Sequence, residues 1–203
     1  MKFIITGKHC SGKLEVLRLL GELGMNIGHE FSNIPKYNAT IYIDPEYEKY
    51  TQNDINDVFE NKCFVSLRNM LGVSMLDSYS YYHGISFDTF DSSDAVIMSP
   101  DQVLSSNRYV FNPNSSNIVW VWLDNTFENR SRRFRDEHRR YDFDEIESLD
   151  SLNSSDFVKI IYPHNSSCHT LYFTNEVPER VAAIVFSIYK HPDLLQIFEQ
   201  YFN

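Results

Sequence analysis

The sequence lacks the residues that a disulfide framework, a cysteine zinc site or a membrane span would require. Its 203 residues include only three cysteines, which are far apart and form no C-x-x-C pair. This usage excludes a disulfide-rich secreted domain. No apolar run approaches the roughly 18 residues of a membrane-spanning helix, and the apolar stretch at residues 3–5 is too short for a secretion signal. We therefore expect a reduced, cytoplasmic protein without membrane contact.

Basic residues are also scarce, and several catalytic patterns are missing. The chain has 18 Lys and Arg against 28 Asp and Glu, which gives a formal net charge of −10. Such a surface repels nucleic-acid phosphates, so a nucleic-acid partner is disfavoured unless a local basic patch overrides the balance. The seven histidines form no H-E-x-x-H pattern, and no serine lies in G-x-S-x-G. The sequence thus shows neither a zinc protease nor a serine hydrolase motif.

What is present is an alternation of apolar, strand-like runs with amphipathic, helix-like segments. The length suits a single domain over residues 1–203. The predicted strands are 2–6, 40–44, 63–67, 95–99, 117–124 and 169–175. The predicted helices are 13–24, 51–61, a short helix capped by Ser86, 125–140, 142–152, 177–190 and 193–202. Strands alternating with helices predict an α/β fold with a mainly parallel central sheet.

The strongest local signal is the segment GKHCSGK at residues 7–13, which fits G-x-x-x-x-G-K. It follows an apolar strand and opens an amphipathic helix, the context that this motif needs to bind phosphate. Loop amides and the helix dipole attract anions, and Lys13 can reach the β- and γ-phosphates of ATP. The predicted ATP-binding residues in this segment are Gly7, Lys8, His9, Cys10, Ser11, Gly12, Lys13 and Leu14. The alternative is an ordinary glycine-rich turn.

Position 14 departs from the usual motif. Leu14 stands where a serine or threonine commonly offers an oxygen to Mg²⁺. The metal would then be held by waters, phosphates and a carboxylate from elsewhere. Asp101 is the candidate, because it lies just past the strand predicted at 95–99, where open parallel sheets place their ligands. The alternative for Asp101 is an acidic residue at a helix start, favoured by the helix dipole.

Arginines are concentrated in one segment. Six of the ten lie between residues 130 and 140, in a chain that is otherwise acidic. Phosphoryl transfer uses guanidinium groups to neutralise charge on the transferring group, and a lid that carries them also excludes water. We therefore expect an arginine lid near 126–145. The alternatives are a solvated face paired with neighbouring carboxylates and a small nucleic-acid patch.

The order of these features resembles the nucleoside monophosphate kinases, most of all the guanylate kinase branch. The resemblance runs through GKHCSGK, the Tyr81–Gly84 segment, Ser99–Gln102, and the strand at 117–124 with the arginines after it, and it has the look of a phage or viral enzyme. It implies a three-layer P-loop fold with an acceptor-binding insertion near 32–90. It also implies catalytic roles for Lys13, Arg133 and Arg139, acceptor contacts for Ser32, Lys36, Tyr82, His83, Ser86 and Asp101, and an ATP contact for Asn175.

Two positions depart from the family. Its acceptor-gripping arginines would fall near 31–36, where the chain has only Lys36, and its guanine-reading glutamate would fall near Ser66. Guanine specificity is therefore not implied, and a pyrimidine or modified deoxynucleotide fits equally well. The resemblance implies an ATP- and Mg²⁺-dependent kinase of nucleoside or deoxynucleoside monophosphates, as a monomer or homodimer.

Two other functions stay open from the sequence. The chain could phosphorylate a hydroxyl group on a modified DNA base or on another small metabolite. That reaction would need a carboxylate base and, for DNA, a basic groove. Alternatively, the chain could be a catalytically inert nucleotide-binding module, an idea that Leu14 and the missing acceptor arginines motivate.

Overall fold

The computed structural model describes residues 1–8, 10–28, 31–36, 63–71, 78–98, 118–137 and 169–202. Within these ranges, only the backbone is described at 31–36, 63–71, 78–84, 86–87, 134–137 and 202. In this part of the chain, no helix combines the length and the apolar character that crossing a bilayer requires.

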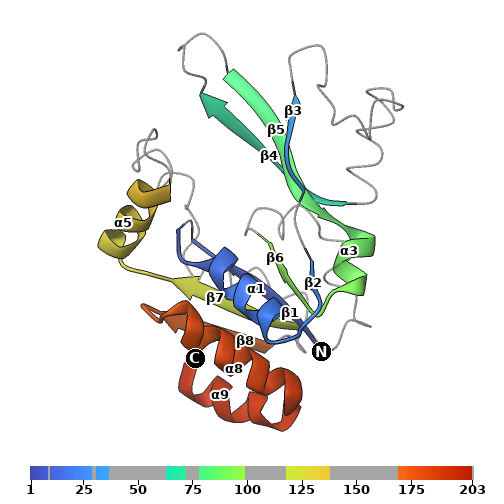
Figure 1. Cartoon of the computed structure of the whole chain (residues 1–203), viewed down its shortest axis with the longest axis vertical. Coiled ribbons are helices and arrows are strands. Elements are labelled where there is room, and N and C mark those ends of the chain that lie inside the picture. The colour runs from blue at the N-terminus through green and yellow to red at the C-terminus, as the bar shows by residue number, and fades with distance from the viewer. Residues whose placement is uncertain are drawn as a thin grey trace.

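A five-stranded parallel sheet forms the centre of the molecule (Figure 1). Its strands are β1 (Lys2–Gly7), β2 (Ile27–Gly28), β6 (Ala95–Ile97), β7 (Ile118–Asp124) and β8 (His169–Thr174). Their order across the sheet is β2-β6-β1-β7-β8, and every neighbouring pair is parallel. The α/β class and the parallel sheet predicted from the sequence are thereby confirmed, and the architecture is compatible with a three-layer P-loop-like fold.

The helices agree with the predicted segments to within a few residues at their ends. They are α1 (Lys13–Glu22), α3 (Phe87–Ser92), α5 (Phe127–Glu137), α8 (Pro178–Lys190) and α9 (Leu195–Phe202), with a 3₁₀ turn, η3, at Pro192–Leu194. The helix α1 ends two residues before Gly24, which adopts a φ of 98° that glycine tolerates best. The predicted helices at 51–61 and 142–152 and the predicted strand at 40–44 lie outside the described residues.

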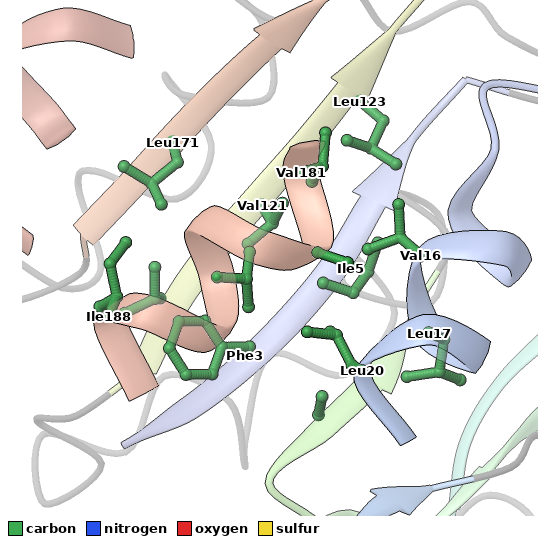
Figure 2. Packing of buried hydrophobic residues seen from close by; sticks show 14 of the residues in the cluster. Phe3, Ile5, Val16, Leu17, Leu20, Val121, Leu123, Leu171, Val181 and Ile188 are labelled. Carbon is green, nitrogen blue, oxygen red and sulfur yellow. The ribbon is translucent and has the colours of Figure 1, made fainter. Parts of the chain in front are cut away.

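Both faces of the sheet are buried, which explains why its strands are continuous apolar runs. On one face, Phe3 and Ile5 of β1 and Val121 of β7 pack against α1 and α8 (Figure 2). On the other face, Ile4 packs with Trp120 and with residues of β6 and α3. Each such side chain contributes about 1.5–3 kcal/mol by leaving water. Packing on both faces holds β1 in place, and on one of these faces α1 packs against it.

A second, antiparallel sheet lies within the segment expected to be the acceptor-binding insertion. It consists of β3 (Phe31–Lys36), β4 (Cys63–Leu71) and β5 (Ser78–Ser86) in the order β3-β5-β4. The β4 strand is longer than the predicted 63–67, because its pairing with β5 continues to Leu71 opposite Ser78. The β3 and β5 strands were not predicted, nor was the short β2 of the parallel sheet. The sheet stands beyond one end of the parallel sheet (Figure 1).

Candidate phosphate-binding site

The site lies at the carboxyl ends of β1 and β7, two neighbouring parallel strands from which the chain continues toward opposite edges of the sheet. From β1 the chain passes through α1 to β2, which is the strand at one edge of the sheet. The strand β8, which lies next to β7, is at the other edge. Open parallel sheets form their ligand crevice outside the carboxyl ends of strands at such a point. The residues at these two ends are Gly7 of β1 and Asp124 of β7.

Two glycines shape the loop between β1 and α1. Gly7 has a φ of 121°, and a Cβ atom there would lie 2.1 Å from the carbonyl oxygen of Leu123 on the neighbouring strand. Gly12 has a φ of 97° and forms the start of α1, with its carbonyl accepting a hydrogen bond from the Val16 amide at 3.0 Å. Because glycine has no side chain to cap the helix, the amides of the first turn receive no cap from this position.

Lys13 and Ser11 close the loop on itself. The Lys13 ammonium donates to the carbonyl oxygens of Gly7 at 2.9 Å and Lys8 at 2.5 Å. The Ser11 hydroxyl, buried inside the loop, donates to the same Lys8 carbonyl at 2.7 Å. Lys13 is therefore held over the loop at the positive end of the α1 dipole. A charged group in this place favours an anionic ligand.

The end of β7 braces the loop from the side. The Asn125 side-chain amide, which is buried, donates to the Ser11 carbonyl at 2.9 Å. One residue earlier, a carboxylate oxygen of Asp124 lies 3.5 Å from the Lys8 ammonium. Neither residue was selected from the sequence. Their position directly after a predicted buried strand was the signal that could have identified them.

The arginine helix α5 reaches the loop through Arg133. Its Nη1 atom lies 2.6 Å from the place that a Cβ on Gly12 would occupy. This atom is buried and has no hydrogen-bond partner among the residues that the structure describes. The hydrogen bond from Arg18 holds the pKa of Glu15 below its usual value, and the charges of Arg18 and Arg133 act in the same direction against burial. The field of Arg133 therefore reaches the first turn of α1.

The remaining described arginines of α5 differ in their surroundings. Arg130 is only 2% exposed, although the sequence placed it in a polar segment. Arg132 is exposed and donates to the Asn129 side chain at 3.3 Å. The segment is thus neither a uniform lid nor a uniform solvated face, because one arginine is in the interior, one is at the loop and one is in solvent.

Asn175 fixes the start of α5. Its backbone amide donates to the Asp124 carbonyl at 2.9 Å, and its side-chain oxygen accepts from the Thr126 amide at 2.8 Å. A φ of 57° at Asn175 lets one residue make both contacts, and asparagine tolerates this conformation well. The expected adenine contact of Asn175 stays a prediction; the observed role is structural.

The structure brings together most of the predicted loop residues and Arg133, and it places five of the predicted acceptor residues on two paired strands of the antiparallel sheet. Ser32 and Lys36 lie on β3, and Tyr82, His83 and Ser86 lie on β5, each described by its backbone only. His9, Asp101 and Arg139 lie outside the described residues. Cys10, half-buried with a φ of 55°, is part of the loop turn.

The described residues do not fit a metal site of their own. Leu14 is 72% exposed and has no oxygen to offer, and the Asp124 carboxylate is engaged by Lys8. Among the described residues, no three His, Cys, Asp or Glu side chains gather in a way that could hold an ion.

The chain matches no model of a known protein family, and no curated protein matches it. Its function must therefore be argued from the loop and the residues around it.

Proposed function

We propose that this chain is an ATP-dependent phosphotransferase that converts a nucleoside or deoxynucleoside monophosphate to the diphosphate. The observation that carries the proposal is the β1–loop–α1 unit. Its two glycines have positive φ, its helix start has no side-chain cap, and its lysine lies across the loop. This arrangement suits the polyphosphate tail of a nucleotide.

The proposed reaction depends on electrostatic stabilisation and not on a covalent enzyme intermediate. An oxygen of the acceptor phosphate attacks the γ-phosphorus of ATP, the bond from that phosphorus to the bridging oxygen breaks, and ADP leaves. Lys13 and Arg133 neutralise negative charge on the phosphates. No general base is needed, because the acceptor phosphate is already ionised. Mg²⁺ would bind the ATP phosphates and shield their charge, with Asp101 as its candidate protein ligand.

The antiparallel sheet is proposed to hold the acceptor. It occupies the same stretch of chain as the acceptor-binding insertion of the resembling family, and β5 carries Tyr82 and His83. A second candidate function is a catalytically inert nucleotide-binding module. Leu14 favours it, because a site without the usual metal ligand is one that could bind a nucleotide without turning it over.

A release assay for ADP across the common monophosphates and deoxymonophosphates, with ATP as donor, tests the proposal. We expect turnover with at least one acceptor and a loss of at least about a hundredfold in Lys13→Ala, since a charge that stabilises the transferring group contributes roughly 3 kcal/mol. Lys190→Ala, on the exposed end of α8, is the matched control and should keep full activity. Nucleotide binding without turnover for every acceptor would instead support the inert module.

A further inference from the structure

The residue after Lys13 distinguishes this loop from a phosphate-binding loop that also offers a side-chain oxygen to Mg²⁺. Leu14 lies in the first turn of α1 with its side chain 72% exposed. The nearest hydroxyl in the loop, that of Ser11, is buried and donates to the Lys8 carbonyl. Neither residue can bring an oxygen to a cation beside a phosphate tail. The described loop therefore has no direct means of recognising Mg²⁺ on a bound nucleotide.

Cationic side chains are present in its place. Lys13 lies across the loop, Lys8 lies at its rim, and Arg133 comes from α5. Asp124 cancels one of these charges through its contact with Lys8. Three cations and one carboxylate leave a net side-chain charge of about +2, to which the α1 dipole adds. The carboxylate of Glu15 is hydrogen-bonded to Arg18, which compensates part of the negative charge that Glu15 brings to the first turn of α1.

The charge balance favours a nucleotide that has not lost charge to a metal. Metal-free ATP keeps the two negative charges that a bound Mg²⁺ would cancel. A loop that gains from charge and not from metal coordination loses attraction when Mg²⁺ neutralises the tail, whereas a loop with a metal-ligating hydroxyl gains from the same ion.

We propose that this loop binds the polyphosphate tail through its amides and its three cations, so that Mg²⁺ does not strengthen nucleotide binding. The inference rests on the proposed function only in assuming that a nucleotide polyphosphate is the ligand. It concerns the binding step and not the transfer. It assigns the lack of a gain from Mg²⁺ to Leu14 and the compensating charge to Lys8, neither of which the proposed reaction requires.

Calorimetry with a non-hydrolysable ATP analogue tests this directly. Wild-type protein is titrated in Mg²⁺ and in EDTA at equal ionic strength, and we expect the dissociation constant in EDTA to be no higher than that in Mg²⁺. Leu14→Ser adds the missing oxygen at an exposed position, where the substitution should not impair folding. It should bind about tenfold or more tightly in Mg²⁺ than in EDTA, which corresponds to a single ligand bond of roughly 1.4 kcal/mol.

A second pair of variants tests the charge. Lys8→Met should weaken binding in EDTA by about tenfold, because a charge-assisted contact to phosphate contributes roughly 1.5–3 kcal/mol. Lys190→Met, remote from the loop, should leave both constants unchanged. The melting temperatures of all variants show whether each remains folded.

The outcomes separate the two proposals. Wild-type binding that is tighter in Mg²⁺ than in EDTA, or a Leu14→Ser protein that gains no metal dependence, overturns the inference and leaves the proposed function intact. If the folded wild-type protein binds the analogue in neither buffer, the proposed function fails as well. Wild-type binding that is no tighter in Mg²⁺ than in EDTA, together with a Leu14→Ser protein that binds more tightly in Mg²⁺, supports the inference.

Discussion

The buried bond from Asn125 to the loop gives the sharpest test of how the site is built. Its side-chain amide donates to the Ser11 carbonyl at 2.9 Å, and both residues are buried. Asn125→Ala leaves that carbonyl without its partner, which costs about 1–3 kcal/mol. Each kcal/mol lowers the melting temperature of a chain this long by about 2–4 °C. We therefore expect a drop of about 2–12 °C, measured by scanning calorimetry or circular dichroism.

Asn125→Asp makes the same test more demanding. The donor is replaced by a carboxylate oxygen that faces the Ser11 carbonyl, so the contact becomes repulsive and a charge is buried as well. This variant should be less stable than Asn125→Ala, and nucleotide affinity should fall by about tenfold or more as the loop loses its brace.

The matched control lies four residues further along. Asn129 accepts a hydrogen bond from the exposed Arg132 at 3.3 Å, so Asn129→Ala and Asn129→Asp should each change stability by at most about 0.5 kcal/mol. If Asn125→Asp and Asn129→Asp have the same melting temperature, the hydrogen bond to Ser11 does not hold the loop, and the proposed bracing by Asn125 is wrong.

Two further predictions use pairs of related positions. Gly7→Ala should cost roughly 2–6 kcal/mol and abolish nucleotide binding, because its Cβ would meet the Leu123 carbonyl oxygen at 2.1 Å, whereas Gly24→Ala, with a similar φ but open space, should cost only about 1 kcal/mol. Equal denaturation midpoints would contradict the close β1–β7 approach. The hydrogen bond from the Tyr189 hydroxyl to Asp94, together with the carboxylate's charge, raises the pKa of Tyr189, so its stabilisation is complete below about pH 10 and is lost as the pH rises through the folded-state pKa. Tyr189→Phe should therefore melt below the wild type at pH 8 and approach it at pH 11; a gap that stays constant across this range would refute the assignment.

Local patterns in the sequence predicted the frame of the site well. The apolar runs of β1 and β7 indicated buried parallel strands, and the spacing of Gly7, Gly12 and Lys13 indicated the loop between strand and helix. These features depend on residues close together in the chain. Secondary structure and the loop motif are therefore visible without knowledge of the partners across the sheet.

The residues that the sequence did not reveal depend on contacts between distant segments. Asn125 matters because β7 lies beside β1, which no local pattern states. Arg130 is buried although its neighbours in the chain are polar, so its position follows from how α5 sits in the fold. The β5 strand was missed for a different reason: its alternation of serine and tyrosine over Ser78–Tyr81 was a usable strand signal.

The anchored start of α5 has a consequence for how this chain can change length. The helix begins at a fixed origin, where the Thr126 amide is tied to Asn175, and Arg133 stands seven positions further on. Seven helical residues span about 10 Å, and each residue is rotated by roughly 100° about the helix axis from the one before it. One extra residue between Thr126 and Arg133 would place the Arg133 guanidinium on another face of α5. Descendants of this sequence should therefore keep that spacing fixed even where surrounding surface segments grow or shrink.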